Sequence, residues 1–511
     1  MVEIGATPIR LNDFEDIVYS NVPVKLSKEV KENVKNTHTF LTTFIKGKVI
    51  YGINTGLGPM AQYRIESADQ IQLQKNLIRS HSAGLGAHQP AHHVKGAMLA
   101  RLVTFAKAKS GVSLETLETL IAFINNNIIP VVSTHGGVGA SGDLVQLSQI
   151  ALCLIGEGEV YFEGKIRSTV DVLKELQIKP LNIGLREGLA LINGTSFMTS
   201  IACTNLIYAK RALNQAILNG CLLNELVESF DDHYSIELNS AKQHKHQRII
   251  AEKISDILKD SKLTKSRAET YYQNSSNDKV FAKKVQEYYS LRCLPQVLGP
   301  IDKVITDAEE VVIDELNSVS DNPIIDMKSK NIYHGGNFHG DFISAEMNKL
   351  KNGIIKLSVL SERQLNFLLN QRLNNIFPPF LNAGTLGLNL GLQGVQYTAT
   401  STTAENQSLS ASIYVHSIPS NNDNQDLVSM GTNEALLTRK VIDNFYDVNS
   451  VLTLAIFQAN SIKNEEIKLS LRTGSLIKQL REIVPVIRQD VEIRPILEDI
   501  KEFLSSSLED R

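Results

Sequence analysis

Long stretches of this 511-residue chain repeat apolar residues at the spacing of an α-helix. The four longest run over 195–229, 304–319, 342–373 and 434–462, and two shorter ones over 116–124 and 143–154. Helices of this length bury one face against their neighbours, which is typical of a bundle. β-like segments are few, and 159–165 predicts a hairpin with Glu163-Gly164 at its turn. The sequence therefore predicts a mainly α fold, a bundle of long helices.

The chain is longer than one compact core usually needs, so more than one structural region is expected. Loops and glycines are frequent before residue 194, and long helical patterns dominate after it. We therefore expect an N-terminal region at 1–194 and a helix bundle at 195–511. Within the bundle, the polar stretch 241–284 predicts a surface excursion, and 463–511 is charged and amphipathic like solvent-facing helices.

Charge and hydropathy exclude several classes of protein. The net charge is −3, with 52 Lys and Arg against 55 Asp and Glu, which argues against nucleic acid as a main partner. No run of about 18 uncharged apolar residues is present, and the N-terminus lacks a basic segment followed by an apolar one, so neither a membrane span nor a secretion signal is expected. The four cysteines are widely spaced in apolar contexts, which predicts reduced core residues of a cytoplasmic protein.

The Gly-rich run 136–143 contains the tripeptide Ala140-Ser141-Gly142, which can cyclise on itself. In a tight bend, the Gly142 nitrogen reaches the Ala140 carbonyl carbon and closes a five-membered ring. Loss of one water there, and of a second from the Ser141 side chain, leaves a methylidene group conjugated to an imidazolone. Such a group is an electrophile, which no ordinary side chain is. Gly142 offers an unhindered nitrogen and free backbone angles, and the other glycines allow the strain that often marks a functional site.

Plainer interpretations of this run stay open. Ser-Gly-Asp before Leu144 is also a helix cap. A phosphate cradle in a nucleotide-binding enzyme is another alternative, but no Lys follows the glycines as the P-loop pattern requires. A helical scaffold without catalytic activity is the third.

Five further segments mix Gly, Asn, Tyr, Arg and His where neither a core nor a plain turn requires them: 51–59, 191–195, 286–293, 334–341 and 420–426. The plainer interpretations are a buried tyrosine at Tyr51, a turn at Asn193-Gly194 and half of a buried ion pair at Arg292. Because Leu291 and Cys293 flank Arg292, its guanidinium also suits the carboxylate of a bound substrate.

Histidine spacing does not predict a metal site. His334 and His339 lie five residues apart, without further ligands at helical or hairpin spacing. Three other histidines are close in sequence, but a proline interrupts any helix through them: His88, Pro90, His92 and His93. No metal cofactor is therefore expected.

Taken together and in this order, these segments resemble the aromatic amino acid ammonia-lyase and aminomutase family, which includes the histidine, phenylalanine and tyrosine ammonia-lyases. The resemblance extends from about residue 10 to 460. It implies a mainly α fold of the fumarase/aspartase-like superfamily, and a homotetramer whose active sites draw residues from three subunits. Ala140-Ser141-Gly142 with Asp143 matches the tripeptide from which the family forms its 4-methylidene-imidazol-5-one (MIO) group, without a metal or a diffusible cofactor.

The resemblance implies a role for each matching residue. Tyr51 is the expected base that removes the β-proton of the amino acid substrate. Asn193 and Tyr289 are expected beside the electrophile, and Arg292, assisted by Asn54, is expected to bind the substrate carboxylate. Three further positions are expected to contact the substrate: Gly58, Gln286 and Phe338.

Two segments bear on which amino acid reacts. Ser80-His81 is similar to the Ser-His pair of the histidine ammonia-lyases, where the phenylalanine enzymes have an apolar pair. A His also binds a phenolic hydroxyl, and a pocket built for that hydroxyl rejects phenylalanine. The second segment is Asn424-Gln425-Asp426. The histidine enzymes have a segment similar to Gln-Glu-Asp here, in which the glutamate faces the imidazole of the substrate, and this chain has Gln425 in place of that glutamate. The expected reaction is therefore deamination of L-tyrosine to (E)-4-coumarate and ammonia, with histidine ammonia-lyase and tyrosine 2,3-aminomutase as the alternatives.

Overall fold

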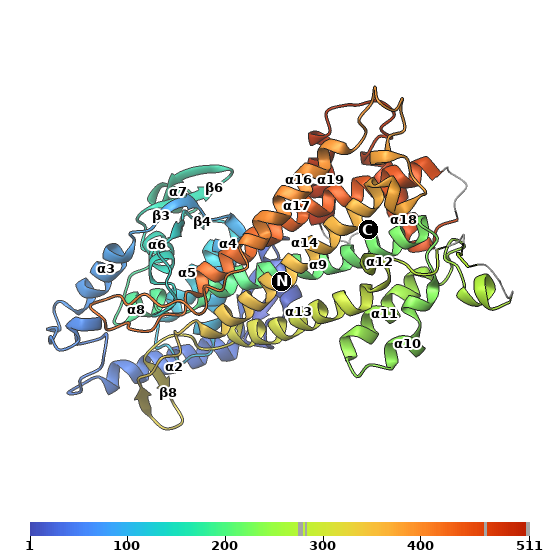
Figure 1. Cartoon of the computed structure of the whole chain (residues 1–511). Helices are drawn as coiled ribbons and strands as arrows, with labels where there is room; N and C mark the ends of the chain where they lie inside the picture. The colour runs from blue at the N-terminus through green and yellow to red at the C-terminus, as the bar shows by residue number, and fades with distance from the viewer. Residues whose placement is uncertain (274–278, 282–283, 464–467, 507–511) are drawn as a thin grey trace. The chain divides into compact units, whose positions relative to one another are not determined.

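The computed structural model describes residues 1–273, 279–281, 284–463 and 468–506. Helices dominate it (Figure 1). The chain forms two compact units, each assembled from three separate segments. Unit 1 comprises Met1–Ile207, Ala308–Asn348 and Ser412–Thr438, and unit 2 comprises Tyr208–Asp307, Lys349–Ala411 and Arg439–Arg511.

These units differ from the two consecutive segments, 1–194 and 195–511, expected from the sequence. The first helix of more than 20 residues, α9, begins at Ser196. The four longest helices, however, each have residues in both units, which a boundary placed along the chain by composition cannot represent. They are α9 (Ser196–Leu226), α13 (Leu294–Leu316), α14 (Asp341–Leu369) and α17 (Gly431–Lys463).

Unit 1 is built around α4 (Ala91–Ala106), which is buried from His93 to its end and packs against α1, α2 and α5. A second group, α3, α6 and α8, packs pairwise. α3 contains Ser80 and His81, while the tripeptide precedes α6 and Asn193 follows α8. The other elements are α1 (Leu11–Val18), α2 (Lys28–Phe44), η1 (Gly58–Met60), α3 (Gln70–His81), α5 (Leu114–Asn125), α6 (Leu144–Leu154), α7 (Thr169–Glu175) and α8 (Glu187–Ile192).

The strands of unit 1 are short. β1 (Val2–Ile4) and β2 (Val24–Leu26) are parallel, whereas β3 (Leu85–His88) with β5 (Ser133–His135), β4 (Ile129–Pro130) with β6 (Glu159–Phe162), β6 with β7 (Lys165–Ser168), and β8 (Ile324–Asp326) with β9 (Asn331–Tyr333) are antiparallel. The hairpin predicted at 159–165 is confirmed as β6–β7, where Phe162 pairs with Lys165 across Glu163-Gly164.

In unit 2, buried amide side chains join the long helices α9 and α17. Asn219 Nδ2 of α9 donates to Asn449 Oδ1 and Thr453 Oγ1 of α17, each at 3.0 Å. The other elements are η2 (Asp231–Tyr234), α10 (Ile236–Ser240), α11 (Lys245–Leu258), the π-helical turn η3 (Ala268–Tyr272), α12 (Tyr289–Arg292), α15 (Gln371–Asn374), η4 (Pro379–Leu381), α16 (Gln393–Ser408), α18 (Leu471–Ile483) and α19 (Arg494–Ser505). The expected polar excursion contains α11 and η3, while 274–278 and 282–283 lie outside the described residues.

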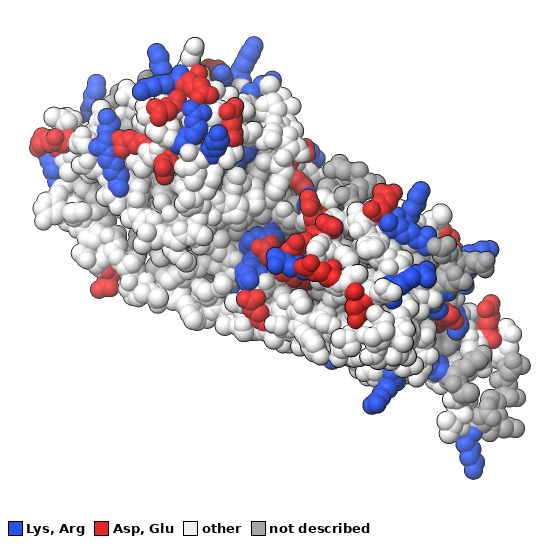
Figure 2. All heavy atoms as spheres, turned by 90° about the horizontal axis from the view of Figure 1, so that it is seen from above, with Lys and Arg blue, Asp and Glu red and all other residues white. Residues whose placement is uncertain are grey.

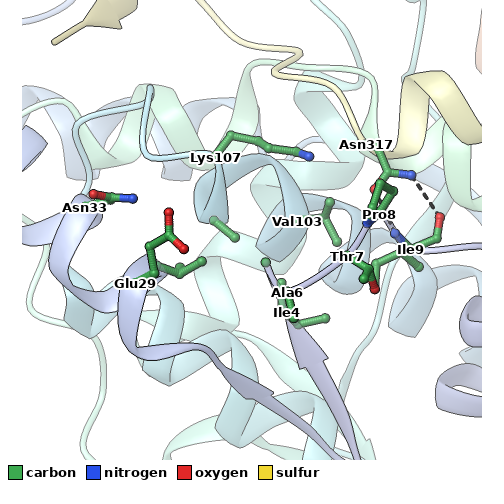
Figure 3. A pocket seen from close by; sticks show the side chains of 13 residues that line it. Ile4, Ala6, Thr7, Pro8, Ile9, Glu29, Asn33, Val103, Lys107 and Asn317 are labelled. Atoms are coloured by element: carbon green, nitrogen blue, oxygen red, sulfur yellow. Dashed lines mark hydrogen bonds between the residues drawn. The ribbon is translucent and has the colours of Figure 1, made fainter. Parts of the chain in front are cut away.

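The predicted long helices are present, with shifted ends. α13 begins at Leu294 rather than at 304, because it accommodates Pro300 in its interior. It ends at Leu316, where the Asn317 side chain exchanges two hydrogen bonds of 2.8 Å with the backbone of Ile9, beside a pocket of about 210 Å³ (Figure 3). The stretch predicted at 342–373 divides into α14 and α15, because Asn370 Oδ1 caps α15 by accepting from the Arg372 N–H at 3.1 Å.

The surface carries mixed charge. On the face shown in Figure 2, acidic and basic side chains are interspersed rather than gathered into one basic field. In the part of the chain that the structure describes, no helix combines the length and the apolar character that crossing a bilayer requires. All four cysteines are free thiols, and three of them are buried as expected, whereas Cys293 is only partly covered.

Candidate active site

The tripeptide Ala140-Ser141-Gly142 lies in the loop between β5 and α6. Gly139 and Gly142 each have a φ of +71°, a left-handed conformation that residues with a Cβ rarely adopt. A Cβ on Gly142 would stand 1.9 Å from the Gly194 carbonyl oxygen, and one on Gly139 would stand 2.1 Å from Ser429 Oγ. Both conformation and space therefore require glycine on either side of Ala140-Ser141.

Two N–H donors converge on the Ser141 carbonyl oxygen. Asn193 Nδ2 donates to it at 3.2 Å and the Gly194 N–H at 3.3 Å. Both donors follow the end of α8, and the Asp143 N–H donates in return to the Gly194 oxygen at 2.9 Å. This geometry resembles an oxyanion hole, in which donors are aimed at an oxygen that gains negative charge.

The segment 412–438 contacts the tripeptide as well. Gln425 Nε2 donates to Ser141 Oγ at 2.8 Å, and Ser420 Oγ lies 3.0 Å from Gln425 Oε1, which orients the amide. Ala140 packs in a small apolar cluster with Val428 and Met430. The Ser141 hydroxyl is thus held by a donor, beside an apolar wall.

Tyr51 begins the loop that leads to η1, and its phenol oxygen accepts a hydrogen bond from the Gly58 N–H at 3.0 Å. An N–H donor stabilises negative charge on that oxygen. A Cβ on Gly58 would stand 2.7 Å from Asn421 Nδ2. The Tyr51 loop therefore comes close to the segment that holds Gln425.

Asn54 uses its side chain within the same loop. Its Oδ1 accepts from the Ile50 N–H at 2.8 Å and its Nδ2 donates to the Lys48 carbonyl oxygen at 2.7 Å. One amide hydrogen of Asn54 is left for another acceptor. Its main contribution here is to close the loop that presents Tyr51.

Ser80 and His81 form the end of α3. Ser80 Oγ donates to the Leu77 carbonyl oxygen at 3.2 Å, and His81 Nδ1 lies 3.0 Å from the same oxygen. Ser80 Oγ also lies 3.1 Å from His81 Nδ1, so Nδ1 either donates to the Leu77 oxygen or accepts from the Ser80 hydroxyl, according to the tautomer. Arg79 fixes this end of the helix by a bidentate contact with Glu157 at 2.6 and 3.1 Å.

Phe338 is half-buried in the loop before α14. Two residues further on, the Gly340 N–H donates to the Gly139 carbonyl oxygen at 3.1 Å, so this loop lies against the glycine-rich run. The neighbouring His339 Nε2 is 3.1 Å from the Leu427 carbonyl oxygen. Among the described residues, no group of three or more His, Cys, Asp or Glu side chains is arranged to hold a metal ion.

Three predicted site residues belong to unit 2: Gln286, Tyr289 and Arg292. Tyr289 is 72% exposed, and the Arg292 guanidinium lies 4.9 Å from the centre of its ring. Gln286 and Tyr289 line an open cavity of about 700 Å³ together with Arg363. Arg292 has no ion-pair partner within the described ranges, and its buried Nε has no acceptor there. The alternative of a buried ion pair therefore has no carboxylate to support it in this part of the chain.

Known proteins are similar in sequence to this chain over nearly its whole length. Residues 9–482 match the family described as aromatic amino acid lyase. The chain belongs to this family. Tyrosine 2,3-aminomutase of Chondromyces crocatus is 36% identical over 510 residues, which cover 98% of this chain and 96% of that protein. Histidine ammonia-lyase of Staphylococcus saprophyticus is 35% identical over 506 residues, which cover 98% of both.

Solved structures of the aromatic amino acid lyase type agree with the fold. Phenylalanine aminomutase from Pantoea agglomerans matches with a TM-score of 0.95 at 30% identity, over 100% of this chain and 99% of that one. Tyrosine aminomutase from Streptomyces globisporus also has a TM-score of 0.95, at 33% identity, over 99% and 96%. The predicted family and mainly α fold are confirmed, and the chain is an enzyme that acts on carbon–nitrogen bonds.

In this member of the aromatic amino acid lyase family, Asp143 anchors the loop. It precedes α6 but makes no side-chain cap there. Its carboxylate instead accepts from the Phe197 and Met198 N–H groups of α9, at 3.0 and 2.9 Å, and from the Thr432 hydroxyl. Burial raises the pKa of Asp143 to about 6. The interpretation of Ser-Gly-Asp as a cap of the helix that begins at Leu144 is therefore wrong, because the Asp143 carboxylate accepts from the first turn of α9 instead.

Arg101 lies behind the Asn193-Gly194 turn and was not predicted. Its guanidinium donates to the Ala190 and Asn193 carbonyl oxygens at 3.1 and 2.5 Å and to Ser320 Oγ at 3.0 Å. Burial lowers the pKa of Arg101 to about 10. The available signal is a lone Arg within the apolar run 97–103, since a charge is rarely buried without a specific partner.

Gln74 is the second residue that sequence reasoning missed. This fully buried side chain of α3 donates from Nε2 to the Gly52 carbonyl oxygen at 3.0 Å and accepts at Oε1 from the Leu189 N–H at 2.9 Å. It joins the Tyr51 loop to α8, which leads to Asn193. A single Gln in an amphipathic helix gives no sequence signal for such a bridge.

Proposed function

We propose that this enzyme is a tyrosine ammonia-lyase that eliminates ammonia from L-tyrosine and releases (E)-4-coumarate. The observation that carries the proposal is the convergence of Asn193 Nδ2 and the Gly194 N–H on the Ser141 carbonyl oxygen, at 3.2 and 3.3 Å. Membership of the aromatic amino acid lyase family supplies the reaction class.

The residues fit an MIO group formed from Ala140-Ser141-Gly142. Glycine at 139 and 142 allows the bend that ring closure needs. Gln425 Nε2 donates to Ser141 Oγ, the oxygen that must leave as water. The donors on the Ser141 carbonyl oxygen withdraw electrons from its Cα, which eases loss of the Cα proton. Once formed, MIO supplies an electrophilic methylidene carbon that makes the amine of the substrate a better leaving group.

Tyr51 is the proposed base for the β-proton of the substrate. The Gly58 N–H, 3.0 Å from the phenol oxygen, supports the negative charge that this role requires. Asn54 and Gln74 fix the loop that carries Tyr51. Held in this way, the base loses little entropy when the substrate binds.

The ring of the substrate is proposed to meet His81 and Gln425. In the proposed tautomer, His81 Nδ1 carries the proton toward the Leu77 carbonyl oxygen, and Nε2 is left as an acceptor that pairs with a phenolic hydroxyl. Phenylalanine would leave this acceptor unpaired, which disfavours it. Gln425 is neutral, so nothing at that position favours a cationic imidazole over a phenol.

The substrate carboxylate is proposed to bind Arg292, with Gln286 and Tyr289 beside it. Tyr289 is largely exposed in unit 2 although Arg292 stacks on it. A large exposed aromatic beside an arginine that has no ion-pair partner in the described part of the chain is typical of a surface that a partner covers. We therefore propose a homotetramer in which these three residues complete the site of a neighbouring subunit. We also propose that the enzyme is cytoplasmic.

Tyrosine 2,3-aminomutase is the second candidate. A protein of that name is 36% identical over 98% of this chain, and a tyrosine aminomutase structure has a TM-score of 0.95. An aminomutase adds the ammonia back at the β-carbon and needs the same residues. Histidine ammonia-lyase is the third, because a protein of that name is 35% identical over 98% of the chain.

Parallel assays with tyrosine, histidine and phenylalanine test the proposal. We expect absorbance from coumarate to rise fastest, and chromatography of the tyrosine reaction to show coumarate rather than β-tyrosine. Accumulation of β-tyrosine would favour the aminomutase, and faster urocanate formation would refute the argument from Gln425. Intact mass should lie two water masses below that of the sequence, whereas Ser141→Ala should have its full mass and no turnover.

A further inference from the structure

Unit 2 contains a second cavity, of about 680 Å³, which is lined by residues 242–247 and by residues of α13. Figure 1 labels the two helices, α11 and α13. Its lining is strongly basic. Three lysines and two histidines contribute to it, and none of its described lining residues is an Asp or Glu: Lys242, His244, Lys245, His246 and Lys303. A cleft lined by one sign of charge raises the local concentration of ions of the opposite sign.

Two of these cations are unneutralised. Lys303 is paired with Asp307 at 2.7 Å, and His246 Nδ1 lies 2.7 Å from Asp302 Oδ2, which leaves Nε2 for another partner. Lys242 and Lys245 have no ion-pair partner anywhere in the described ranges. The first turn of α11 has no acidic residue either, so its lysine adds to the positive end of the helix dipole. An anion in the cavity would offset the repulsion among these basic side chains and the repulsion between Lys245 and the positive end of the helix dipole.

The cavity is held open by fixed contacts. Gly299 of α13 lies against the backbone of α11, since a Cβ on it would stand 2.8 Å from Gln247 N and Cα. Asn239 Nδ2 donates to the His233 and Ser235 carbonyl oxygens, so Asn239 Oδ1 is an acceptor for Gln247 Nε2 at 3.0 Å. Close packing thus fixes α13 against α11, and the hydrogen bond from Gln247 fixes α11 to α10.

The same network extends to α13, since Gln296 Nε2 donates to Asn239 Oδ1 at 3.2 Å. Residues of α10, α11 and α13 beside the cavity are thereby joined by hydrogen bonds through Asn239.

We propose that this cavity binds a small molecule that carries phosphate groups. Lys242 and Lys245 bind the phosphate oxygens, and His246 Nε2 donates to them when protonated. The volume lies in the range of small-molecule sites. This site lies wholly within unit 2 and does not depend on the proposed lyase reaction.

Calorimetric titration of the full-length protein with ADP, inorganic pyrophosphate and adenosine tests the phosphate contacts. ADP and pyrophosphate should bind, more weakly as salt is raised, and adenosine should not. Lys242→Gln and Lys245→Gln should each weaken both phosphate ligands about tenfold. Lys259→Gln, beyond the far end of the same helix, is the matched control and should leave both affinities unchanged.

No heat from either phosphate ligand, or lysine variants that bind like Lys259→Gln, would overturn the site.

Discussion

The Asn193 side-chain amide donates to the Ser141 carbonyl oxygen at 3.2 Å, across 52 residues of sequence. The backbone N–H of the next residue, Gly194, donates to the same oxygen. α8 ends at Ile192 and thereby delivers both donors, while Arg101 holds their turn from behind through the Asn193 carbonyl oxygen. The turn at Asn193-Gly194 thus supplies both a side-chain donor and a backbone donor to the Ser141 carbonyl oxygen.

Asn193→Ala should reduce kcat for tyrosine by about 100-fold to 1000-fold, because it removes one of two donors at an oxygen that gains charge. Initial rates of coumarate formation measure the loss, and intact mass shows whether the tripeptide has still lost its two waters. Asn126→Ala is the matched control, since that exposed amide also donates to a backbone carbonyl oxygen, at 2.8 Å. Normal kcat in Asn193→Ala would remove the oxyanion argument.

Gly142→Ala should have the unprocessed mass and no activity. Its φ is +71°, and the added Cβ would stand 1.9 Å from the Gly194 oxygen. Gly164→Ala separates the two effects: this glycine has a φ of +75° but no neighbour within 4 Å of the added Cβ. It should cost about 1 kcal/mol of folding free energy and keep full activity. Loss of two waters in Gly142→Ala would contradict the requirement for glycine.

The sequence predicted features that depend on local pattern. Helical spacing identified α9, α14 and α17, and the turn residues identified the β6–β7 hairpin, because periodicity and turn chemistry are written in neighbouring residues. The start of α13 was missed for a local reason as well. Pro300 usually ends a helix, yet here it lies inside one.

Contacts between distant segments could not be predicted in this way. Gln425 reaches Ser141 across 284 residues, and Gln74 joins Leu189 across 115. The family resemblance pointed to Gln425, but nothing in a single sequence marks Gln74 or the role of Arg101. Composition along the chain also could not show that both compact units are assembled from interleaved segments.

Asp143→Asn should change how stability depends on pH. Burial raises the pKa of Asp143 from 3.8 when unfolded to about 6 when folded. The folded state therefore binds this proton more tightly, and the wild type loses stability relative to the variant as pH rises from about 4 to 6. Two pKa units correspond to about 3 kcal/mol. Denaturant unfolding at several pH values measures this, with Asp314→Asn on the exposed side of α13 as control. A constant difference from pH 4 to 7 would contradict it.

His81→Phe should lower kcat/KM for tyrosine by about 100-fold and raise it for phenylalanine. The variant removes the Nε2 acceptor, so a buried phenolic hydroxyl has no partner, whereas a plain ring gains apolar contact. Both substrates are measured on the same preparation, so a folding defect would lower both rates together. An unchanged preference for tyrosine would show that His81 does not read the hydroxyl.

Gln425→Glu should raise the ratio of histidine to tyrosine turnover, as kcat/KM, by about tenfold. The new carboxylate attracts a cationic imidazole and loses the donor that Gln425 Nε2 gives to Ser141 Oγ. Gln425→Met is the matched control: it also loses the donor but adds no charge, so tyrosine turnover should fall without a gain for histidine. Intact mass of both variants shows whether the tripeptide is processed, which separates a defect in forming the electrophile from a change in binding. If histidine gains nothing in Gln425→Glu although the tripeptide is processed, charge at this position does not select the substrate.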